Sequence, residues 1–332
     1  MRNILCVTLI ALLGGCTSTS VTEKYQDKRN DIINVKDKVI EFETGNVLIG
    51  SVSRLYMSNK CLLIADHKSV DKQIHIFNKN DFSYLTSIGN FGEGPEEITV
   101  MGCLAIDEAH HQLYVSDHAK QKIFSYDMDS VMVDSLYKPQ VKTAMNETLF
   151  PSEYQYINDT LSIAGLIKTT STSTFNQFLG RWNMNTGEMI PMKYTHPDIQ
   201  KKRITFAASE KAGIYVECYT RHDLMTICSL DGELLYNIYG PDWDGGNGNK
   251  LQSFGTVMIG NDKIFVSYCG EDYARDSFPT KILVFDLEGN YLKTLETGYK
   301  ISDCCYDSFN NRIILSLNDV VQFAYLDIDG II

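Results

Sequence analysis

A short apolar strand recurs along the chain at a nearly constant spacing. Each copy is dominated by Leu, Ile, Val, Phe and Tyr, and a loop and a second, alternating strand follow it. The copies end at residues 66, 117, 165, 218, 268 and 317, which gives intervals of 51, 48, 53, 50 and 49 residues. Such a steady period indicates one supersecondary unit that is repeated six times.

Turn residues separate the strands within each repeat. Asn, Asp, Gly and Ser cluster where an inner hairpin should turn, as at Asp107-Glu108, Asn158-Asp159 and Asn310-Asn311. No window of eleven or more residues beyond the N-terminal segment shows the 3.6-residue period of an amphipathic helix. Four strands in each repeat of about 50 residues predict an all-β fold, a six-bladed β-propeller with four-stranded blades.

The two ends of the chain are predicted to complete one blade together. After Asp303 there is room for only three strands before Ile332, so the last blade lacks its outer strand. Residues 35–42, and notably Val39-Ile40-Glu41-Phe42, form a strand-like segment that belongs to no repeat. We predict that this N-terminal strand pairs with residues 322–326 and closes the ring, because closure removes an exposed edge. The propeller is therefore expected to span residues 35–332.

The first fifteen residues have the composition of a signal peptide. Arg2 precedes an apolar run at residues 4–13, which is too short to cross about 30 Å of hydrocarbon. The run ends in Leu13-Gly14-Gly15-Cys16, which resembles the bacterial lipobox. That resemblance implies cleavage before Cys16 and lipidation of Cys16, and several acyl chains give a stable membrane anchor. The alternative is an ordinary signal peptide with a chance cysteine. Residues 16–34 are predicted to be the lipidated cysteine and a polar tether.

Charge and cysteine content limit the partners. The net charge of −12 argues against nucleic acid, because phosphate binding needs clustered Lys and Arg. Of nine cysteines, Cys6 leaves with the signal and Cys16 is the lipid acceptor, so seven remain. They show no CxxC pair and no zinc-like spacing to His. We predict that most are small buried hydrophobes, with one or two disulfides at most.

One face of the propeller should gather polar side chains. The loops that lead into each innermost strand share this face with the loops that follow each second strand. The polar residues expected there are Arg54, Asp66, His67, Asp117, His118, Glu153, Arg221, His222, Glu271, Asp272, Arg275 and Asp303. A concave mouth with convergent polar groups is the default position for a binding site. For Asp66 and Asp117 we favour the simpler interpretation that each caps its own turn. For His67 and His118, solvated loop histidines are favoured over metal ligands.

An enzymatic alternative is a calcium-dependent lactonase or esterase of the six-bladed class. Its site resembles a ring of Glu, Asn and Asp on the innermost strands, because Ca²⁺ takes six or more oxygen ligands. The matching positions, uncertain by two residues, are Arg54, Gly102, Glu153, Phe206, Thr256 and Asp303. Two carboxylates and an arginine make a poor calcium cage. We therefore predict an ion-pair cluster of Arg54, Glu153 and Asp303 at the channel mouth, with no metal and no cofactor.

Two glycine-rich segments are weaker signals. Residues 89–94 read G-x-x-G-x-G without a following helix, so they do not match a dinucleotide-binding loop. Residues 242–249 resemble a calcium loop, but the twelfth position is Ser253 where such a loop has Glu. We interpret the second segment as the connection from the fourth to the fifth blade, with Trp243 as a candidate exposed stacking residue.

The first two repeats resemble a known family. Residues 62–67 (LLIADH) with 73–77 (QIHIF), and the equivalent residues of the second repeat, resemble NHL-type propeller repeats. Residues 88–98 (IGNFGEGPEEI) resemble the blade connection of TolB-like six-bladed propeller lipoproteins of Bacteroidetes. The resemblance covers about residues 40–330. It is weaker in the third and fourth repeats, where Gly165 and Cys218 replace the repeat aspartate.

The resemblance implies a fold and a cellular location more than an activity. It implies a Gram-negative cell envelope, and the absence of an acidic run after Cys16 favours an outer-membrane anchor that faces the periplasm. We expect a non-catalytic binding or scaffold module that recognises a protein, peptide or glycan. The predicted ligand-binding residues are Arg54, Glu153, Asp303, His67, His118 and Trp243. The calcium-dependent hydrolase remains the alternative.

Overall fold

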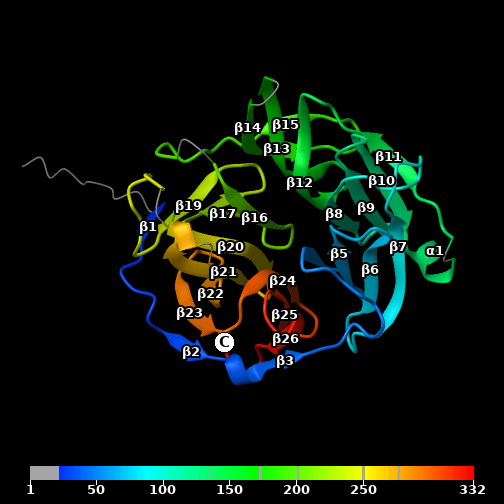
Figure 1. Cartoon of the computed structure of the whole chain (residues 1–332). Coiled ribbons are helices and arrows are strands. Elements are labelled where there is room, and N and C mark those ends of the chain that lie inside the picture. The colour runs from blue at the N-terminus through cyan, green and yellow to red at the C-terminus, as the bar shows by residue number, and fades with distance from the viewer. Residues whose placement is uncertain (1–21, 135, 172–173, 200–201, 249–250, 276) are drawn as a thin grey trace, which may run out of the picture.

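The computed structural model describes residues 22–134, 136–171, 174–199, 202–248, 251–275 and 277–332. These residues form six sheets arranged as blades around a central axis (Figure 1). Cys16 and the signal segment lie outside the described residues. Among the described residues, no helix is long and apolar enough to cross a membrane.

Each blade is an antiparallel meander whose first strand lies nearest the axis. Blade 1 consists of β4 (Ser53–Met57), β5 (Cys61–Asp66), β6 (Lys72–Asn78) and β7 (Tyr84–Asn90). Blade 2 consists of β8 (Met101–Asp107), β9 (Gln112–Asp117), β10 (Lys122–Asp127) and β11 (Gln140–Ala144), with the short helix α1 (Met128–Val133) after β10. Blade 3 consists of β12 (Leu149–Asn158), β13 (Leu161–Ser171), β14 (Thr174–Trp182) and β15 (Met189–Pro191).

The other three blades take strands from both ends of the chain. Blade 4 consists of β16 (Ile204–Ser209), β17 (Ile214–Tyr219), β18 (Leu224–Ser229) and β19 (Leu234–Tyr239), with β1 (Glu23–Tyr25) at its edge. Blade 5 consists of β20 (Leu251–Gly260), β21 (Lys263–Asp272), β22 (Lys281–Asp286) and β23 (Tyr291–Glu296), with β2 (Ile32–Asn34) at its edge. Blade 6 consists of β24 (Ile301–Asp307), β25 (Arg312–Leu317), β26 (Phe323–Asp327) and β3 (Val39–Glu41).

Neighbouring blades pack face to face and bury apolar layers between them. Leu63 and Ile74 of blade 1 join Val115 and Phe124 of blade 2 in one such layer, and all four side chains are fully buried. Each fully buried side chain of this size contributes about 1.5–3 kcal/mol. All seven cysteines in the described range are buried and free, as expected of small apolar residues, so no disulfide forms among them.

The predicted ring closure is confirmed. β3 pairs antiparallel with β26, so that Val39 lies opposite Leu326 and Glu41 lies opposite Ala324. Phe42 follows β3 and stacks on Phe82 of blade 1, with ring centroids 3.9 Å apart. The N-terminal strand therefore completes blade 6 and also contacts the neighbouring blade.

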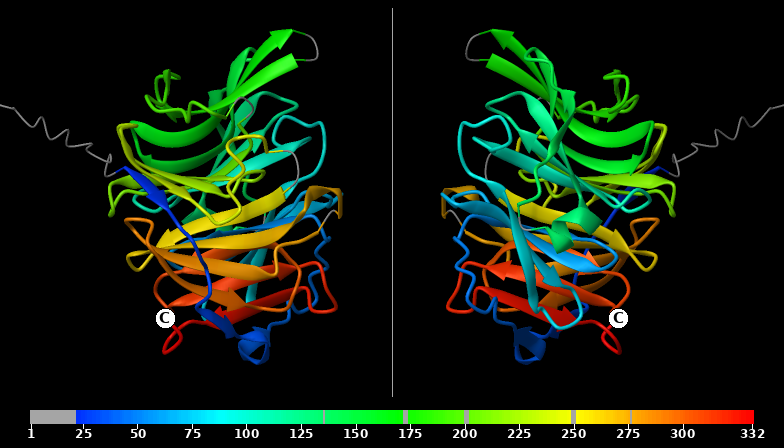
Figure 2. Two further views of the ribbon diagram at one scale, coloured as in Figure 1. Left: turned by 90° about the vertical axis from the view of Figure 1, so that its left-hand side faces the viewer. Right: turned by 90° about the vertical axis from the view of Figure 1, so that its right-hand side faces the viewer.

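The predicted tether is wrong in its extent, because residues 22–34 lie on the propeller. β1 pairs parallel with β19, and β2 pairs parallel with β23, so blades 4 and 5 each have five strands (Figures 1 and 2). Between these strands, Arg29 donates to Asp223 at 2.7 Å, and both side chains are buried. Each of the two strands has only three residues, which is too short for an alternating strand pattern to be recognised in the sequence.

Candidate functional site

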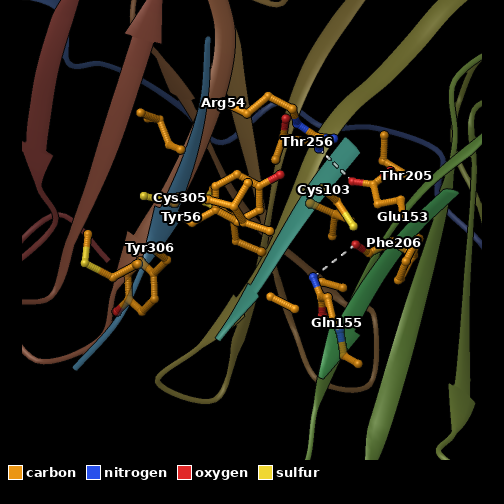
Figure 3. Close-up of a pocket in the computed structure, with 18 of the residues that line it drawn as sticks. Arg54, Tyr56, Cys103, Glu153, Gln155, Thr205, Phe206, Thr256, Cys305 and Tyr306 are labelled. Atoms are coloured by element: carbon orange, nitrogen blue, oxygen red, sulfur yellow. Dashed lines mark hydrogen bonds and ion pairs between the residues drawn. The ribbon is translucent and has the colours of Figure 1, made fainter. Parts of the chain in front are cut away.

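A channel runs along the axis and is lined by the innermost strands of all six blades. Its volume is about 320 Å³. Each of β4, β8, β12, β16, β20 and β24 contributes four lining residues, and Figure 3 shows several of their side chains. The meander places the first residues of these strands at one end of the channel. That end is the mouth predicted from the repeat pattern.

An ion-pair cluster lies at the mouth, as the sequence predicts. Arg54 Nη2 donates to Glu153 Oε1 at 2.7 Å, and Arg54 Nε lies 4.0 Å from Asp303 Oδ2. The Arg54 and Glu153 side chains are each 40% exposed, whereas that of Asp303 is 7% exposed. The cluster thus joins blades 1, 3 and 6 across the channel and keeps part of its charge open to solvent.

Asp303 is fixed from two further directions. Its Oδ2 accepts from the Leu55 backbone N–H at 2.8 Å, and its Oδ1 accepts from Thr256 Oγ1 at 2.7 Å. Burial raises the pKa of Asp303, and the Arg54 guanidinium and these hydrogen bonds oppose that shift. Asp303 is therefore the buried counter-charge that positions Arg54, and Glu153 is the accessible carboxylate of the cluster.

The deeper channel contains thiols and phenols rather than an activated nucleophile. Burial raises the pKa of Cys103 to about 12 and raises the pKa values of Cys304 and Cys305. Burial also raises the pKa of Tyr56, whose hydroxyl is buried without a hydrogen-bond partner. These groups are protonated at neutral pH, so they provide no thiolate or phenolate.

The channel does not fit the calcium site of the enzymatic alternative. Glu153 and Asp303 are the only carboxylates among its lining residues, and both contact Arg54. Cys103 lines the channel whereas its neighbour Gly102 does not, and the His118 ring packs closely against Gly102. A hard cation that needs six or more oxygens would have too few ligands here.

His67 and His118 are not the solvated histidines that the sequence favours. Both are half-buried, and each has an Nε2 that is buried without a hydrogen-bond partner. Burial lowers the pKa of His67, and the positive charge of Arg54 lowers it further. Burial also lowers the pKa of His118. The two rings lie in different blades and do not form a metal-ligand group among the described residues.

Asp66 and Asp117 cap their own loops, as expected. Asp66 accepts from the backbone N–H groups of Gly50 and Lys68 at 2.7 and 2.9 Å. Asp117 accepts from the backbone N–H groups of Thr99 and Ala119 at 2.8 and 2.9 Å. These carboxylates hold two blade connections in place and do not line the channel.

Trp243 is not an exposed stacking residue. It is half-buried in the connection that follows β19, where its ring centroid lies 5.0 Å from that of Tyr239, 5.7 Å from that of His196 and 5.9 Å from that of His222. The connection between blades 4 and 5 folds back over apolar side chains, which an isolated sequence segment does not reveal. The remaining polar residues of this face lie away from the channel, in an Arg221–Tyr273 stacking contact and an Arg275–Glu271 ion pair.

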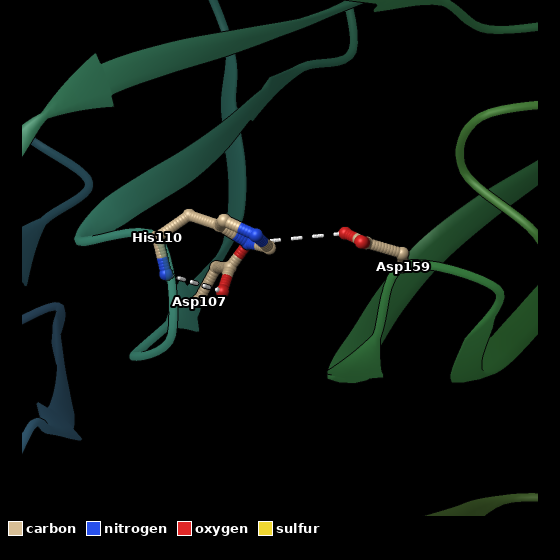
Figure 4. A group of neighbouring side chains, drawn as sticks. All are labelled: Asp107, His110 and Asp159. Atoms are coloured by element: carbon tan, nitrogen blue, oxygen red, sulfur yellow. Dashed lines mark hydrogen bonds and ion pairs between the residues drawn. The ribbon is translucent and has the colours of Figure 1, made fainter.

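A second polar cluster, which the sequence did not single out, lies at the opposite end of the blades (Figure 4). His110 Nδ1 lies 2.9 Å from Asp107 Oδ2 and 3.9 Å from Asp159 Oδ1. In the equivalent turn of blade 6, Asn310 Nδ2 donates to Asp307 Oδ2 at 2.7 Å. Because an amide makes the same contact there, we interpret the Asp107–His110 bond as a turn contact and assign no metal to it.

Comparisons with known proteins support the architecture. Residues 17–216 match the model of the family DUF5128, which is described as a 6-bladed beta-propeller. A member of the DUF4221 family from Bacteroides vulgatus is similar with a TM-score of 0.62 and 12% identity, over 90% of this chain and 98% of that chain. No curated protein matches the chain.

Two further solved structures share the fold. A Bacteroides fragilis protein described as exported has a TM-score of 0.58 and 13% identity, over 89% of this chain and 87% of that chain. A luciferin-regenerating enzyme has a TM-score of 0.56 and 8% identity, over 86% of this chain and 94% of that chain. At these identities the likeness shows the fold alone.

Proposed function

The chain belongs to the DUF5128 family of six-bladed β-propellers, and from this premise we propose that it is a non-catalytic binding module of the bacterial envelope. Its ligand would be a protein segment, peptide or glycan that enters the channel mouth. The lipid anchor at Cys16 would hold the module on the outer membrane, facing the periplasm. This proposed location rests on the lipobox resemblance, and it agrees with the description of the Bacteroides fragilis neighbour as an exported protein.

The open ion pair at the mouth carries the proposal. Arg54 has five N–H donors, and the described contacts occupy Nη2 and approach Nε, so donors remain for a ligand. Glu153 offers acceptor oxygens from the same place. A ligand with both acceptors and donors, such as a peptide backbone or a sugar hydroxyl pair, can replace water on both groups without leaving a charge unpaired.

The shape of the face agrees with an extended ligand. β13 and β14 in blade 3, and β20 and β21 in blade 5, are longer than the five- to seven-residue inner strands of blades 1, 2 and 6. The mouth side holds the end of the β13–β14 hairpin, where Ser171 pairs with Thr174, and the open ends of β20 and β21, where Leu251 pairs with Asp272. They flank the mouth, so a partner that reaches Arg54 would also contact these raised edges.

A ligand screen tests the binding proposal. The full chain is screened by thermal shift against envelope glycans and peptides, with calcium and a chelator as further arms. Arg54→Ala should weaken any ligand found by about tenfold, whereas the control Arg181→Ala should leave it unchanged. Arg181 has a similar exposure of 38% and an ion pair to Asp231, but it lies on β14 away from the channel. Equal affinities for Arg54→Ala and the wild type would refute the proposed site, and calcium-dependent esterase activity would favour the alternative.

The anchor is tested separately. Cells fed an alkyne-bearing fatty acid should label the wild-type protein and not a Cys16→Ala variant. Unlabelled wild-type protein would refute the anchor while leaving the ligand site untouched.

A further inference from the structure

A cavity of about 420 Å³ lies between blades 1 and 2, at the end of the blades away from Arg54. Its walls come from β5, β7, β8, β9 and α1 and are mainly apolar. The apolar side chains in these walls include Cys61, Leu63, Leu85, Ile106, Met128 and Met132. Small-molecule sites in proteins have volumes of about 300–1,000 Å³ and are lined mainly by such side chains. We call this space the blade 1–2 cavity.

The equivalent space between blades 6 and 1 is filled by a cationic side chain of the protein itself. Arg312, the first residue of β25, places its guanidinium 4.7 Å from the Phe82 ring centroid. Its Nε donates to Asp307 Oδ2 at 3.3 Å, and its Nη2 donates to the backbone O of Lys79. An apolar stem with a positive head group therefore occupies this space, and a carboxylate provides the counter-charge.

One blade further on, the position of Arg312 carries a short side chain. Asp307 pairs with Arg312 across the first turn of blade 6, and Ser58 pairs with Cys61 across the same turn of blade 1. The Cys61 thiol thus stands where blade 6 has the guanidinium, and it cannot span the space that Arg312 fills. Met128 of α1 lines the cavity from blade 2, and its flexible side chain can adapt to an occupant. The blade 1–2 cavity is therefore open to a ligand.

The charged side chains at the cavity are mainly acidic. The carboxylates among the described residues that line it are those of Asp107, Glu108 and Asp129. Lys60 is the only lysine or arginine among those residues. The next cavity along, at the turns of blades 2, 3 and 4, is lined by two further carboxylates beside His110, those of Asp159 and Glu210. The electrostatic field at this end of blade 2 therefore attracts cations and repels anions.

The carboxylates suit an amphiphilic cation rather than a metal ion. Asp107 is buried and bonded within its own turn, whereas Glu108 and Asp129 are exposed. The Asn59 backbone N–H and His111 each contact one oxygen of the exposed carboxylates, at 2.6 and 2.8 Å, so both carboxylates can accept from a ligand as well. Among the described residues, the three carboxylates form no group whose oxygens all lie close enough to hold a metal. A ligand with one positive head group and an aliphatic chain fits this arrangement.

We propose that the blade 1–2 cavity binds a protonated aliphatic amine, with its chain among Leu85, Met128 and Met132. Its ammonium group lies at the exposed carboxylates of Glu108 and Asp129. The apolar walls bury the methylene groups and supply most of the affinity. The exposed carboxylates add less and select the sign of the head group. This site is separate from the channel mouth and does not depend on the ligand proposed there.

Photolabelling tests the proposal on the full chain in nanodiscs of a zwitterionic lipid. The probes are decylamine, decanol and decanoate, each with a photoreactive diazirine at the chain terminus, and mass spectrometry maps the labelled residues. Decylamine should label residues 128–132 above all other segments and more strongly than decanol does, and decanoate should label them least. Equal labelling by decylamine and decanoate, or labelling spread evenly over the chain, would overturn the proposal.

The place of the aliphatic chain is tested with a matched pair of variants. Leu85→Lys replaces part of the apolar wall with an ammonium group, which should lower decylamine labelling of residues 128–132 by about tenfold. The control Leu292→Lys should change it less than twofold. Leu292 has a similar exposure and also occupies the second position of a fourth strand, in blade 5. Equal losses in both variants would refute a site between blades 1 and 2.

The head group is tested with Glu108→Gln, which keeps an oxygen to accept from the Asn59 backbone N–H. This variant should lower decylamine labelling about two- to fivefold and leave decanol labelling unchanged, as expected for an exposed ion pair. The control Glu210→Gln should change neither, because Glu210 is also exposed and also follows a first strand, but in blade 4. Lys60→Gln should raise decylamine labelling about twofold. Decylamine labelling that falls in Lys60→Gln, or that does not respond to Glu108→Gln, would contradict the assigned ligand class.

Discussion

The protein contains two arginine–carboxylate pairs with the same separation and opposite surroundings. Arg29 and Asp223 are 2.7 Å apart with side-chain exposures of 7% and 0%, and Arg54 and Glu153 are 2.7 Å apart with exposures of 40% each. Distance alone therefore does not distinguish them. Burial does, because a buried pair that loses one partner leaves an uncompensated charge, whereas water replaces the lost partner of an open pair.

The buried pair holds the N-terminal arm to the ring. The Arg29 guanidinium lies over the rings of Phe254, Tyr268 and Phe285, at 5.4–5.7 Å from their centroids. Burial raises the pKa of Asp223, and Arg29 lowers it by stabilising the carboxylate. The arm thus depends on this contact between blades 4 and 5, whereas the mouth keeps its shape through the hydrogen bonds of Asp303 and leaves Arg54 free to meet a ligand.

The largest effect is expected when the buried pair is broken. Arg29→Ala should lower the free energy of unfolding by about 3–5 kcal/mol, because Asp223 would remain buried without its counter-charge. Urea denaturation followed by tryptophan fluorescence measures the change. Arg275→Ala serves as the control, since its pair with Glu271 is exposed, and a similar loss in both variants would show that burial is not the deciding factor.

Removal of the closing aromatic contact should have a somewhat smaller effect. Phe42→Ala should cost about 3 kcal/mol, because the buried ring stacks on Phe82 and its loss leaves a cavity between blades 6 and 1. Phe175→Ala, on an exposed ring of β14, should change stability little when melting is compared by calorimetry. Unchanged melting of Phe42→Ala would argue against closure through this segment.

Acid should weaken the fold through half-buried histidines such as His118. Burial lowers the pKa of folded His118 below 6.5, so the unfolded chain takes up a proton first as the pH falls. Stability is then retained above about pH 6.5 and lost below it, by up to about 1.4 kcal/mol per pH unit for one such group. Unfolding free energies measured from pH 7.5 to 5 should fall less steeply in His118→Gln. An identical slope in the variant would exclude His118 as a contributor.

The open pair should matter least to stability. Arg54→Ala should lower the free energy of unfolding by about 1 kcal/mol or less, because Asp303 keeps its bonds to Leu55 and Thr256. The same urea titration measures this change in the free energy of unfolding. A loss as large as that of Arg29→Ala would mean that Arg54 holds the ring together, and its proposed ligand role would lose its support.

The sequence predicts what the repeat determines and misses what depends on neighbouring blades. The six blades and the closing strand β3 follow from a steady period and a missing fourth strand. β1 and β2 were not predicted, because three residues are too few to show a strand pattern and their pairing partners, β19 and β23, are remote in sequence.

The candidate site also contains residues that the repeat predicts and residues whose surroundings it does not predict. Arg54, Glu153 and Asp303 were predicted together because they occupy equivalent positions on innermost strands, and the structure brings them together. Trp243 was misjudged because its ring packs against His196 and His222, which are remote in sequence, as well as against the nearby Tyr239. The cavity between blades 1 and 2 lies beside Cys61, at the position where blade 6 has Arg312, and no single repeat on its own predicts such a difference.

The contrast between the buried Arg29–Asp223 pair and the open Arg54–Glu153 pair is tested most directly by hydrogen exchange. The exchange of the Nε–H groups of Arg29 and Arg54 is followed by ¹⁵N-edited NMR. Arg29 Nε donates to Gln26 at 3.0 Å within the buried arm contact, whereas the Arg54 side chain is open to solvent. The Arg29 signal should persist at pH 7 and the Arg54 signal should be broadened by exchange with water. Equal exchange rates for the two groups would contradict the division into a structural pair and a binding pair.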